Sequence, residues 1–364
     1  MDLSTLSGRA GAQGRIVTIK SFHRKLDIAN GRVDLSHGAG GRAMAQLIAE
    51  IFHAALDNDW LRRGDDQAVF EVAEGRMAMT TDAFVVSPLF FPGGDIGSLA
   101  VHGTLNDIAM SGARPLYLSA SFIVEEGFPL ADLARIAKSM GDASRAAGVP
   151  VIAGDTKVVE RGKADGVFIS TAGVGVVPKG LDLSSDRARP GDVVVLSGSI
   201  GDHGVAIMSS RENLEFDCEI MSDSASLHGL VAEMVLAAGG ALRLMRDPTR
   251  GGLAATLNEI AQASKIGFRI DESAIPVKPE VAAACELLGL DPLNVANEGK
   301  LVAVAAPEGA QALLAAMRAH PRGRDAGIIG RVVEDDRRFV QMTSTFGGAR
   351  IVDWLAGEQL PRIC

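Results

Sequence analysis

The stretch RMAMTTDAFVVSPLFFPGGDIGSLAVHGTLNDIAM, residues 76–110, contains the pattern from which the fold is predicted. Its first part, residues 76–86, has the apolar and β-branched composition of a strand, and its last part, residues 96–110, has the length and apolar spacing of a helix. Pro and Gly residues mark a turn between them. A strand that leads directly into a helix of this size indicates an α/β (α+β) protein.

The alternation of strands and helices continues on both sides of this stretch. In the first half, the sequence predicts a helix at 42–52, a strand at 115–124, a helix at 130–147 and strands near 149–153 and 167–177. A polar segment at 183–191 ends in Pro-Gly and separates a second series. That series has a strand at 193–196, helices near 227–238, 252–264 and 281–288, a strand at 301–305, and a last helix–strand pair ending near Met342.

These breaks divide the chain into four parts, with the boundary between two domains near Asp186. Residues 1–33 are expected to be a loosely ordered extension, since they carry scattered Arg and Lys and no long apolar run. The domains are then 34–185 and 186–342. From Thr343 the remainder, 343–364, is predicted to be a short and irregular tail.

Composition narrows the class of protein. The 364 residues are 47% hydrophobic, enough for the cores of two domains, and no apolar run reaches the roughly 18 residues that would span a bilayer. With 36 Lys and Arg against 45 Asp and Glu, and 4% aromatic residues, nucleic acid is not an expected partner. Three widely spaced cysteines, at 218, 285 and 364, indicate a reducing cytoplasm rather than a disulfide framework.

The last four residues, Pro361, Arg362, Ile363 and Cys364, end the chain on a thiol. A terminal thiol is exposed to oxidation unless something shields it, so a chemical role is the favoured interpretation and an accidental end residue the alternative. Prenylation requires a cysteine four residues from the end, which excludes it here. Arg362 favours the thiolate and the terminal carboxylate opposes it, so the direction of the pKa shift stays open.

Two Gly-rich turns lead into predicted helices and could bind anions through their free backbone N–H groups. Asp247 and Arg250 belong to the second turn, residues 247–252, where Arg250 could clamp a phosphate. Simple helix capping is the alternative for both turns. The first turn contains His37, Gly38, Gly40 and Gly41.

Several aspartates follow strands or occupy turns in a way that suits Mg²⁺. Asp66, Asp82 and Asp155 are the candidates for oxygen ligands of a magnesium ion that also keeps waters and nucleotide phosphates. Each could instead cap a helix or close a turn. Asn106 and Asp107 interrupt an apolar helical run, so we predict that they face a site rather than solvent.

Taken together, the segments 80–97, 103–113, 154–158, 247–252 and 361–364 resemble the HypE family, the carbamoyl dehydratases of nickel–iron hydrogenase maturation. The resemblance covers the chain from Asp34 to Cys364. It implies a fold shared with aminoimidazole ribonucleotide synthetase and selenophosphate synthetase. In that fold, N-terminal domains form a β-barrel across a homodimer, the C-terminal domain is a mixed α/β sandwich, the tail is flexible, and ATP with Mg²⁺ binds between the domains near the dimer interface.

The resemblance also implies a reaction. The carbamoyltransferase HypF would load a carbamoyl group on Cys364, ATP-dependent dehydration would turn the S-carboxamide into a thiocyanate, and the cyanide would pass to iron on the HypC–HypD scaffold complex. A free-substrate synthetase or kinase of the same fold, or a docking protein without turnover, are the alternatives. The implied nucleotide contacts are His37, Gly38, Gly40, Gly41, Asp82, Asn106, Asp107, Asp155, Thr156 and Asp247, and the implied metal ligands are Asp66, Asp82 and Asp155.

The reaction needs groups for phosphate and for protons. Lys157 or Arg250 would meet phosphate, and Glu298 is the first candidate for the base that takes a proton from the carbamoyl nitrogen. A surface salt bridge between Glu298 and Lys300 is the alternative for that loop. His203 is a second candidate for the base, with a purely structural histidine as its alternative.

Overall fold

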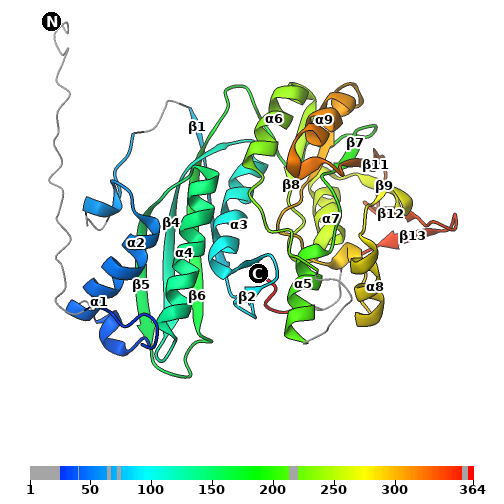
Figure 1. Ribbon diagram of the computed structural model, residues 1–364. Coiled ribbons are helices and arrows are strands. Elements are labelled where there is room, and N and C mark those ends of the chain that lie inside the picture. Colours follow the sequence, from blue (N-terminus) through cyan, green and yellow to red (C-terminus); the bar gives the residue numbers. More distant parts are fainter. Residues whose placement is uncertain (1–24, 40, 64–66, 72–74, 213–219, 355–359) are drawn as a thin grey trace, which may run out of the picture.

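The computed structural model describes residues 25–39, 41–63, 67–71, 75–212, 220–354 and 360–364 (Figure 1). It contains a four-stranded sheet in the first half of the chain and a seven-stranded sheet in the second. Both sheets carry helices, which confirms the α/β prediction. None of the described helices combines the length and the apolar character that crossing a membrane would require.

The four-stranded sheet has the order β1-β6-β4-β5, so β1 and β5 are its edges. β6 pairs antiparallel with β1 and with β4, whereas β4 and β5 run parallel. Helices α3 and α4 pack together over one face of this sheet (Figure 1). The strands are β1 (Arg76–Phe84), β4 (Arg114–Glu125), β5 (Val151–Val159) and β6 (Val167–Val177), and the helices are α3 (Ile96–Met110) and α4 (Leu130–Ala147).

The start of α3 shows why residues 76–110 fold as the sequence predicts. The short strands β2 (Phe90–Phe91) and β3 (Gly94–Asp95) form the turn, and the Asp95 carboxylate caps α3 by accepting from the N–H groups of Gly97 and Ser98. A Cβ at Gly97 would lie 2.3 Å from the Ile136 carbonyl oxygen of α4. Glycine therefore allows α3 and α4 to approach closely.

The residues before the first sheet are more ordered than predicted. Val33 is buried and exchanges backbone hydrogen bonds with Phe128 and Gly127, and Arg32 forms a bridge with Pro129. The expectation of a loose extension is therefore wrong at residues 32–33. The predicted helix at 42–52 is confirmed as a continuous run of α1 (Arg42–Leu47), the π-helical η2 (Ile48–His53) and α2 (Ala54–Leu56). The short turns η1 (Leu35–Gly38) and η3 (Leu61–Arg63) lie before and after it.

The seven-stranded sheet has the order β13-β12-β9-β11-β7-β10-β8. Its strands are β7 (Val193–Leu196), β8 (Leu242–Arg246), β9 (Gly267–Asp271), β10 (Val302–Ala305), β11 (Gly327–Val333), β12 (Val340–Thr343) and β13 (Ala349–Val352). Its helices are α5 (Asp202–Arg211), α6 (His228–Ala238), α7 (Gly252–Ser264), α8 (Pro279–Leu288) and α9 (Pro307–Ala319), and short turns η4 (Gly239–Ala241), η5 (Glu272–Ala274), η6 (Pro292–Asn294) and η7 (Pro321–Gly323) connect them.

The prediction of an irregular chain after Thr343 is wrong at residues 349–352. These residues form β13, which pairs antiparallel with β12 and extends the sheet at its edge. The run is too short and too mixed in composition to be recognised without its partner strand. Strands β8 and β9 and helix α5 were also missed.

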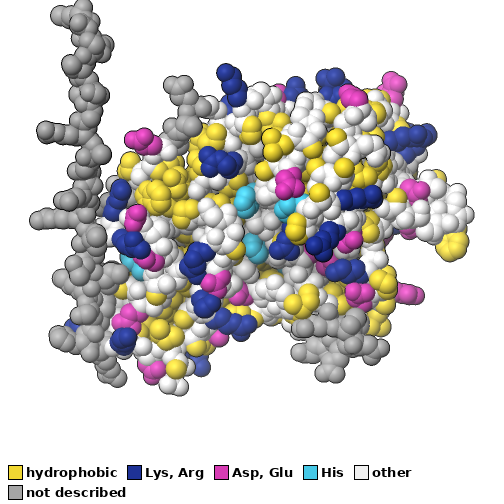
Figure 2. All heavy atoms as spheres, turned by 45° about the horizontal axis from the view of Figure 1, so that its top comes forward, with side chains coloured by type: hydrophobic (Ala, Val, Ile, Leu, Met, Phe, Trp, Pro, Cys, Tyr) yellow, Lys and Arg dark blue, Asp and Glu magenta, His cyan; other side chains and the backbone are white. Residues whose placement is uncertain are grey.

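One hydrophobic cluster crosses between the two halves of the chain. It joins Phe84 and Phe91 from the first half to Val205 and Val295 from the second, and it includes Ile363 of the tail. The surface outside it carries intermingled acidic and basic side chains on the face drawn in Figure 2. The C-terminal end lies between β2 and α5, where the two halves meet (Figure 1).

Candidate active site around the terminal cysteine

The last three residues lie alongside the segment that follows β1. The Val85 N–H donates to the Cys364 carbonyl oxygen at 3.1 Å, and the Ser87 N–H donates to the Arg362 carbonyl oxygen at 3.1 Å. The Arg362 side chain returns a hydrogen bond to the Val85 carbonyl oxygen at 2.9 Å and also pairs with Asp165. The tail is therefore docked by a short strand-like ladder.

Side chains from both halves hold the docked tail. Ile363 is 1% exposed and sits in the shared hydrophobic cluster. Arg211 of α5 donates to the carbonyl oxygens of Ser87 and Arg362, at 2.7 and 3.0 Å. The terminal residue Cys364 is consequently half-buried rather than free in solvent.

Docking determines the chemical state of the thiol. Burial and the charge of Glu298 raise the pKa of Cys364 to about 12, although Arg250, whose guanidinium lies 3.4 Å from Sγ, acts in the opposite direction. The pKa of Cys364, whose direction of shift the sequence left open, is thus raised. A docked, unmodified Cys364 is a neutral thiol at physiological pH and a poor nucleophile.

Carboxylates surround the docked thiol. Burial, followed by repulsion from Asp247 and other acids, holds the pKa of Glu298 well above its ordinary value. Burial raises the pKa of Asp247 to about 7 and that of Asp82 to about 6, and repulsion from Asp107 adds to both. Burial also raises the pKa of Asp107, which accepts a hydrogen bond from Thr80 at 2.9 Å. These acids, together with Cys364 and Arg250, form what we call the interdomain group.

The Glu298 loop is fixed by buried polar contacts. Asn297 is fully buried, and its side chain bonds to the backbone of Gly201, Pro248 and Val295. Asp223 accepts from the Glu298 N–H at 3.0 Å and pairs with Lys300 at 3.1 Å. The alternative of a surface salt bridge between Glu298 and Lys300 is therefore wrong.

The Asn106 side chain binds the backbone of the Glu298 loop and of the segment at 225–227, and does not face a ligand pocket. Its amide donates to the carbonyl oxygens of Ala225 and Glu298, at 3.0 and 3.2 Å, and accepts from the Leu227 N–H at 2.8 Å. All of these partners are backbone groups, and the side chain is buried. Of the predicted pair, only Asp107 belongs to the interdomain group. The Asn106 side chain instead spends its hydrogen bonds on backbone groups and so links α3 to the second half of the chain.

The second Gly-rich turn carries Asp247 and Arg250 into the same group. Gly251 and Gly252 have φ values of 81° and 62°, which favour glycine. A Cβ at Gly252 would lie 2.5 Å from the Leu293 carbonyl oxygen. The two glycines let the turn pass close to the 293–295 backbone and begin α7 directly behind Arg250.

His203 does not have a free ring nitrogen for proton transfer when the tail is docked. Nε2 lies 2.8 Å from the Ile363 carbonyl oxygen, and Nδ1 lies 2.8 Å from Ser222 Oγ. Burial lowers the pKa of His203, so the ring is neutral. The second candidate for the base is therefore engaged in holding the tail.

The remaining predicted residues lie together at β5, at the other edge of the four-stranded sheet. Asp155 and Lys157 pair on the open face of the strand, with Nζ 2.7 Å from both carboxylate oxygens, and this hydrogen bond lowers the pKa of Asp155. Gly38 packs directly on Val158, where a Cβ would lie 2.8 Å from the valine Cβ. We call these residues the sheet-edge group: His37, Gly38, Gly41, Asp155, Thr156 and Lys157.

His37 is buried and accepts the Asp34 N–H, so it caps the turn before α1. Thr156 is buried beneath α1 and η2, where it lines an apolar pocket of about 100 Å³ that also reaches Asp155. Gly40 and Asp66 lie outside the described residues.

Strand register separates the two groups within one chain. Asp82 aligns through Thr171 and Ala120 with Gly154, three strand spacings away, which corresponds to about 14 Å. Asp82 faces α3, since its Oδ2 would lie 3.5 Å from a Cβ at Gly103, whereas Asp155 points to the open face. The predicted joint ligation of one metal by Asp82 and Asp155 therefore fails within a single chain.

The described residues contain no set of three His, Cys, Asp or Glu side chains already arranged to hold a metal ion. The interdomain group nevertheless fits Mg²⁺ in charge, because Asp82, Asp107 and Asp247 repel one another and a cation would relieve that repulsion. Mg²⁺ also needs only one or two carboxylates when phosphate oxygens and waters complete its shell.

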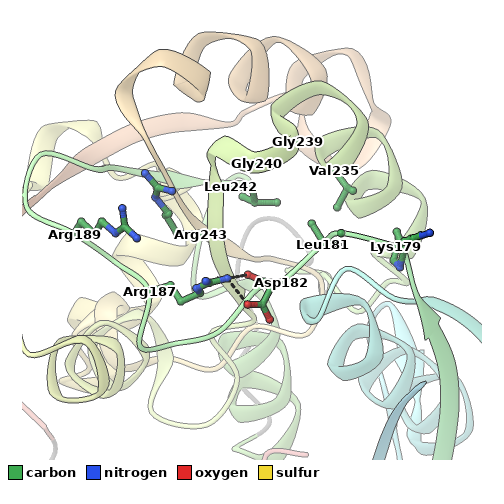
Figure 3. Close-up of a pocket in the computed structure, with 12 residues that line it drawn as sticks. Lys179, Leu181, Asp182, Arg187, Arg189, Val235, Gly239, Gly240, Leu242 and Arg243 are labelled. Carbon is green, nitrogen blue, oxygen red and sulfur yellow. Dashed lines mark hydrogen bonds and ion pairs between the residues drawn. The ribbon is translucent and has the colours of Figure 1, made fainter. Parts of the chain in front are cut away.

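A larger pocket belongs to neither group. It has a volume of about 450 Å³ and lies between the segment joining the two halves, the end of α6 and the start of β8 (Figure 3). Arg187 and Asp182, which line it, form an ion pair, and Arg243 lies near Asp192. It contains none of the residues that the sequence singled out.

Sequence reasoning missed the residues that dock the tail and fix the Glu298 loop. They are Arg211, Ser222 and Asp223, and none lies in a recognisable motif. The only signal is the polar run at 222–224, which appears as an ordinary loop in the sequence. Arg362 was noted for its charge alone.

Comparison with known proteins agrees with this architecture. The AIR synthase related N-terminal domain matches residues 64–177, and the corresponding C-terminal domain matches residues 189–343. A carbamoyl dehydratase HypE from Rhizobium leguminosarum bv. viciae is 77% identical over 346 residues, which is 95% of this chain and 99% of that protein. The chain belongs to the HypE family. A HypE from Escherichia coli K12 is 47% identical over 91% of this chain and 99% of its own length.

Solved structures of HypE proteins share the fold. A HypE crystal structure in complex with ATP superposes with a TM-score of 0.87 at 48% identity, covering 91% of this chain and 99% of that one. A chain of a HypE–HypF complex superposes with a TM-score of 0.75 at 50% identity, covering 85% and 99%. The two-domain aminoimidazole ribonucleotide synthetase-like fold predicted from the sequence is confirmed.

Proposed function

We propose that this HypE-family protein uses ATP to dehydrate an S-carbamoyl group on its own Cys364 to a thiocyanate, giving ADP and phosphate. The thiocyanate would supply cyanide for the iron of a nickel–iron hydrogenase. The observation that carries the proposal is the docked tail, which brings the terminal sulfur beside Glu298 and a group of carboxylates with raised pKa values. A cysteine with no chemical role would not require this arrangement.

The chemistry needs two events at the carbamoyl group. The carbamoyl oxygen attacks the γ-phosphorus of ATP and ADP leaves; the C–O bond then breaks with phosphate as the leaving group while the nitrogen loses its protons and the C≡N bond forms. Glu298 is placed to accept a proton, because its raised pKa makes it a stronger base than an ordinary carboxylate once ionised. Arg250, next to the sulfur, is placed to meet phosphoryl charge.

Asp82, Asp107 and Asp247 would hold Mg²⁺ from the interdomain side. When bound, Mg²⁺ would neutralise phosphoryl charge and orient the phosphates. Asp155, Lys157, Thr156 and the turn at 37–41 would approach the same nucleotide from a second subunit. Among the described strands, β1 and β5 are the edges of the four-stranded sheet, and this supports the arrangement, because joining the β1 edge of one protomer to the β5 edge of the other would close a barrel.

The open face of the sheet also supports a homodimer. Met77, Met79 and Ile123 are 42%, 76% and 41% exposed in the single chain, on the side away from α3 and α4. Closing the barrel would cover them. The domain limits 34–185, 186–342 and 343–364 belong to the same proposal, in which the last segment is a tail that leaves the site to meet HypF and the HypC–HypD complex in the cytoplasm.

The test is the intact mass of the C-terminal peptide after incubation with HypF, its substrates and ATP. We expect a carbamoyl adduct on Cys364 that becomes one water lighter only with hydrolysable ATP. An unmodified cysteine in a mixture where HypF is active would refute the proposal.

A further inference from the structure

We propose that His203 is a positioning residue that holds the tail in its docked state, and that the segment 222–225 couples this docking to the placement of Glu298. The inference concerns tail docking and needs neither ATP nor a carbamoyl group. It goes beyond the proposed dehydration by assigning a role to His203 and Ser222 that the reaction itself does not require.

His203 lies at the junction of three parts of the molecule. It is the second residue of α5, is completely buried, and packs edge-on against Phe91 with ring centroids 5.6 Å apart. Its Nε2 contacts the Ile363 carbonyl oxygen at 2.8 Å, one residue before the reactive cysteine. A hydrogen bond at this point fixes the tail where displacement would most affect the sulfur.

The hydrogen-bond partners define the tautomer. A carbonyl oxygen can only accept, so Nε2 carries the hydrogen, and in a neutral imidazole Nδ1 must then accept. Ser222 Oγ therefore donates to Nδ1 across 2.8 Å, and it accepts in turn from the Ser224 N–H at 3.1 Å. Ser222 holds the histidine in the one form that can bind the tail.

Ser222 is itself held in place by the turn before α3. Its N–H donates to the Pro92 carbonyl oxygen at 2.9 Å, and a Cβ at Gly93 would lie 2.8 Å from the Ser222 backbone. The segment thus has little room to shift without breaking the contact to His203.

The same segment reaches the Glu298 loop on its other side. Asp223 accepts the Glu298 N–H at 3.0 Å, and the Ala225 N–H donates to the Glu298 carbonyl oxygen at 3.2 Å. A Cβ at Gly299 would lie 1.8 Å from the Asp223 carbonyl oxygen, so the two backbones are in direct contact. Along this segment, Ser222 and Ser224 set the tautomer of His203, whereas Asp223 and Ala225 bind the backbone of Glu298.

A positioning role predicts a specific change in thiol reactivity. The docked tail is held by hydrogen bonds from Val85 and His203, and burial raises the pKa of its thiol to about 12, so we expect the docked thiol to react more slowly at pH 8 than a released one. The alkylation rate of Cys364 therefore measures the released fraction. A catalytic base would not change this rate in the absence of ATP and a carbamoyl group.

The experiment is iodoacetamide labelling of the full-length protein at pH 8, followed by mass spectrometry of the C-terminal peptide. The variants are His203→Leu, His203→Gln, which keeps a donor, and Ser222→Ala. The control is His228→Leu, because His228 also pairs with a serine, Ser226, at 2.6 Å but has no contact with the tail among the described residues. Buried Cys285 reports on global unfolding in every sample.

We expect His203→Leu and Ser222→Ala to raise the Cys364 rate about tenfold, His203→Gln to stay within about threefold of the parent, and His228→Leu to change nothing. If Cys285 also becomes reactive in His203→Leu, that variant is unfolded, and the Cys364 rate in Ser222→Ala then tests the proposal. An unchanged Cys364 rate in Ser222→Ala overturns the proposal. A parent rate equal to that of a free peptide ending in Pro-Arg-Ile-Cys also overturns it.

Discussion

The interdomain group and the sheet-edge group contain the same kinds of residue but place them in opposite environments. The interdomain group combines three aspartates with Arg250 beside a Gly-rich turn, and the sheet-edge group combines one aspartate, Asp155, with Lys157 beside another. In the interdomain group, burial and mutual repulsion raise the pKa of Asp82 and Asp247. In the sheet-edge group, an exposed pair with Lys157 lowers the pKa of Asp155. Environment, more than residue type, separates a group that can exchange protons near neutral pH from one that stays ionised.

This difference suggests a division of labour within the proposed dimer. The interdomain group has the raised pKa values that proton transfer needs and the repulsion that a metal would relieve. The sheet-edge group supplies a charge pair on β5, an edge strand of the four-stranded sheet. Substitutions in the two groups should therefore differ in their effects on activity and on stability.

The largest loss of activity is expected from replacing Cys364, whose sulfur would carry the carbamoyl group in the interdomain group. Cys364→Ser should abolish adduct formation and carbamoyl-dependent phosphate release, with a loss of at least about 10³-fold, because a hydroxyl is a far weaker nucleophile than a thiolate. The mass of the C-terminal peptide measures it, and Cys285→Ser is the matched control. Carbamoyl-dependent phosphate release that persists in the serine variant would show that Cys364 is not the carrier.

Glu298→Gln should lower the dehydration rate by about 10² to 10⁴, the range that a lost general base accounts for. Carbamoylation by HypF should remain close to that of the parent, because the backbone contacts that hold the Glu298 loop do not depend on its carboxylate. Single-turnover conversion of the carbamoyl peptide to the thiocyanate peptide gives the rate. A loss of less than about fivefold would assign the base elsewhere.

Mixing two inactive variants tests whether the groups meet across subunits. In a dimer built from Glu298→Gln and Asp155→Asn chains, one of the two sites would regain both residues if the sheet-edge group of one protomer serves the interdomain group of the other. Random mixing of equal amounts should then restore about a quarter of parental activity, since half of the dimers are mixed. If the mixture is no more active than the two variants measured separately, the two groups do not form a shared site across subunits.

The sequence predicted most of the fold because its strands and helices have strong local signals. Residues 96–110 are a long apolar run that follows the capping residue Asp95, and residues 130–147 have apolar periodicity and end before Gly148, so the structure places α3 and α4 at those bounds. Strand β13 was missed because residues 349–352 are a strand only by pairing with β12. Helix α5 was missed because buried polar residues such as Asp202 and His203 remove its amphipathic pattern.

The candidate site was predicted as a set of residues but not as an arrangement. Glu298, Asp82 and Arg250 act electrostatically on Cys364, and Asp247 acts on Glu298, whereas the roles that the resemblance implied for these residues stay predictions. Nothing in the sequence distinguishes Asn106, which ties backbone segments together, from its neighbour Asp107, which joins the acids. That distinction depends on which side of α3 faces the 225–227 backbone, and it requires the packing of both domains.

The smallest expected effects are changes in melting temperature. At pH 8, substitution of an aspartate should change the melting temperature in opposite directions in the two groups. The pKa of Asp247 is about 7 in the folded chain against an ordinary value of 3.8, so the folded state binds the proton more tightly. Without Mg²⁺, the stability contributed by this group is complete below about pH 4 and is lost as the pH rises to 7. Asp247→Asn should therefore raise the melting temperature at pH 8 by about 2–4 °C for each kcal/mol relieved, and leave it unchanged at pH 4.

Asp155→Asn should do the opposite at the sheet edge. The pKa of Asp155 is lowered, so its pairing with Lys157 stabilises the protein above the ordinary pKa and is lost as the pH falls. Because that pair is more than half exposed, removing it should lower the melting temperature at pH 8 by no more than about 2 °C. Differential scanning calorimetry in EDTA at pH 4 and pH 8 measures both variants. A shift of the same sign for both at pH 8 would mean that burial does not distinguish the two groups, and that the raised pKa of Asp247 is not present in solution.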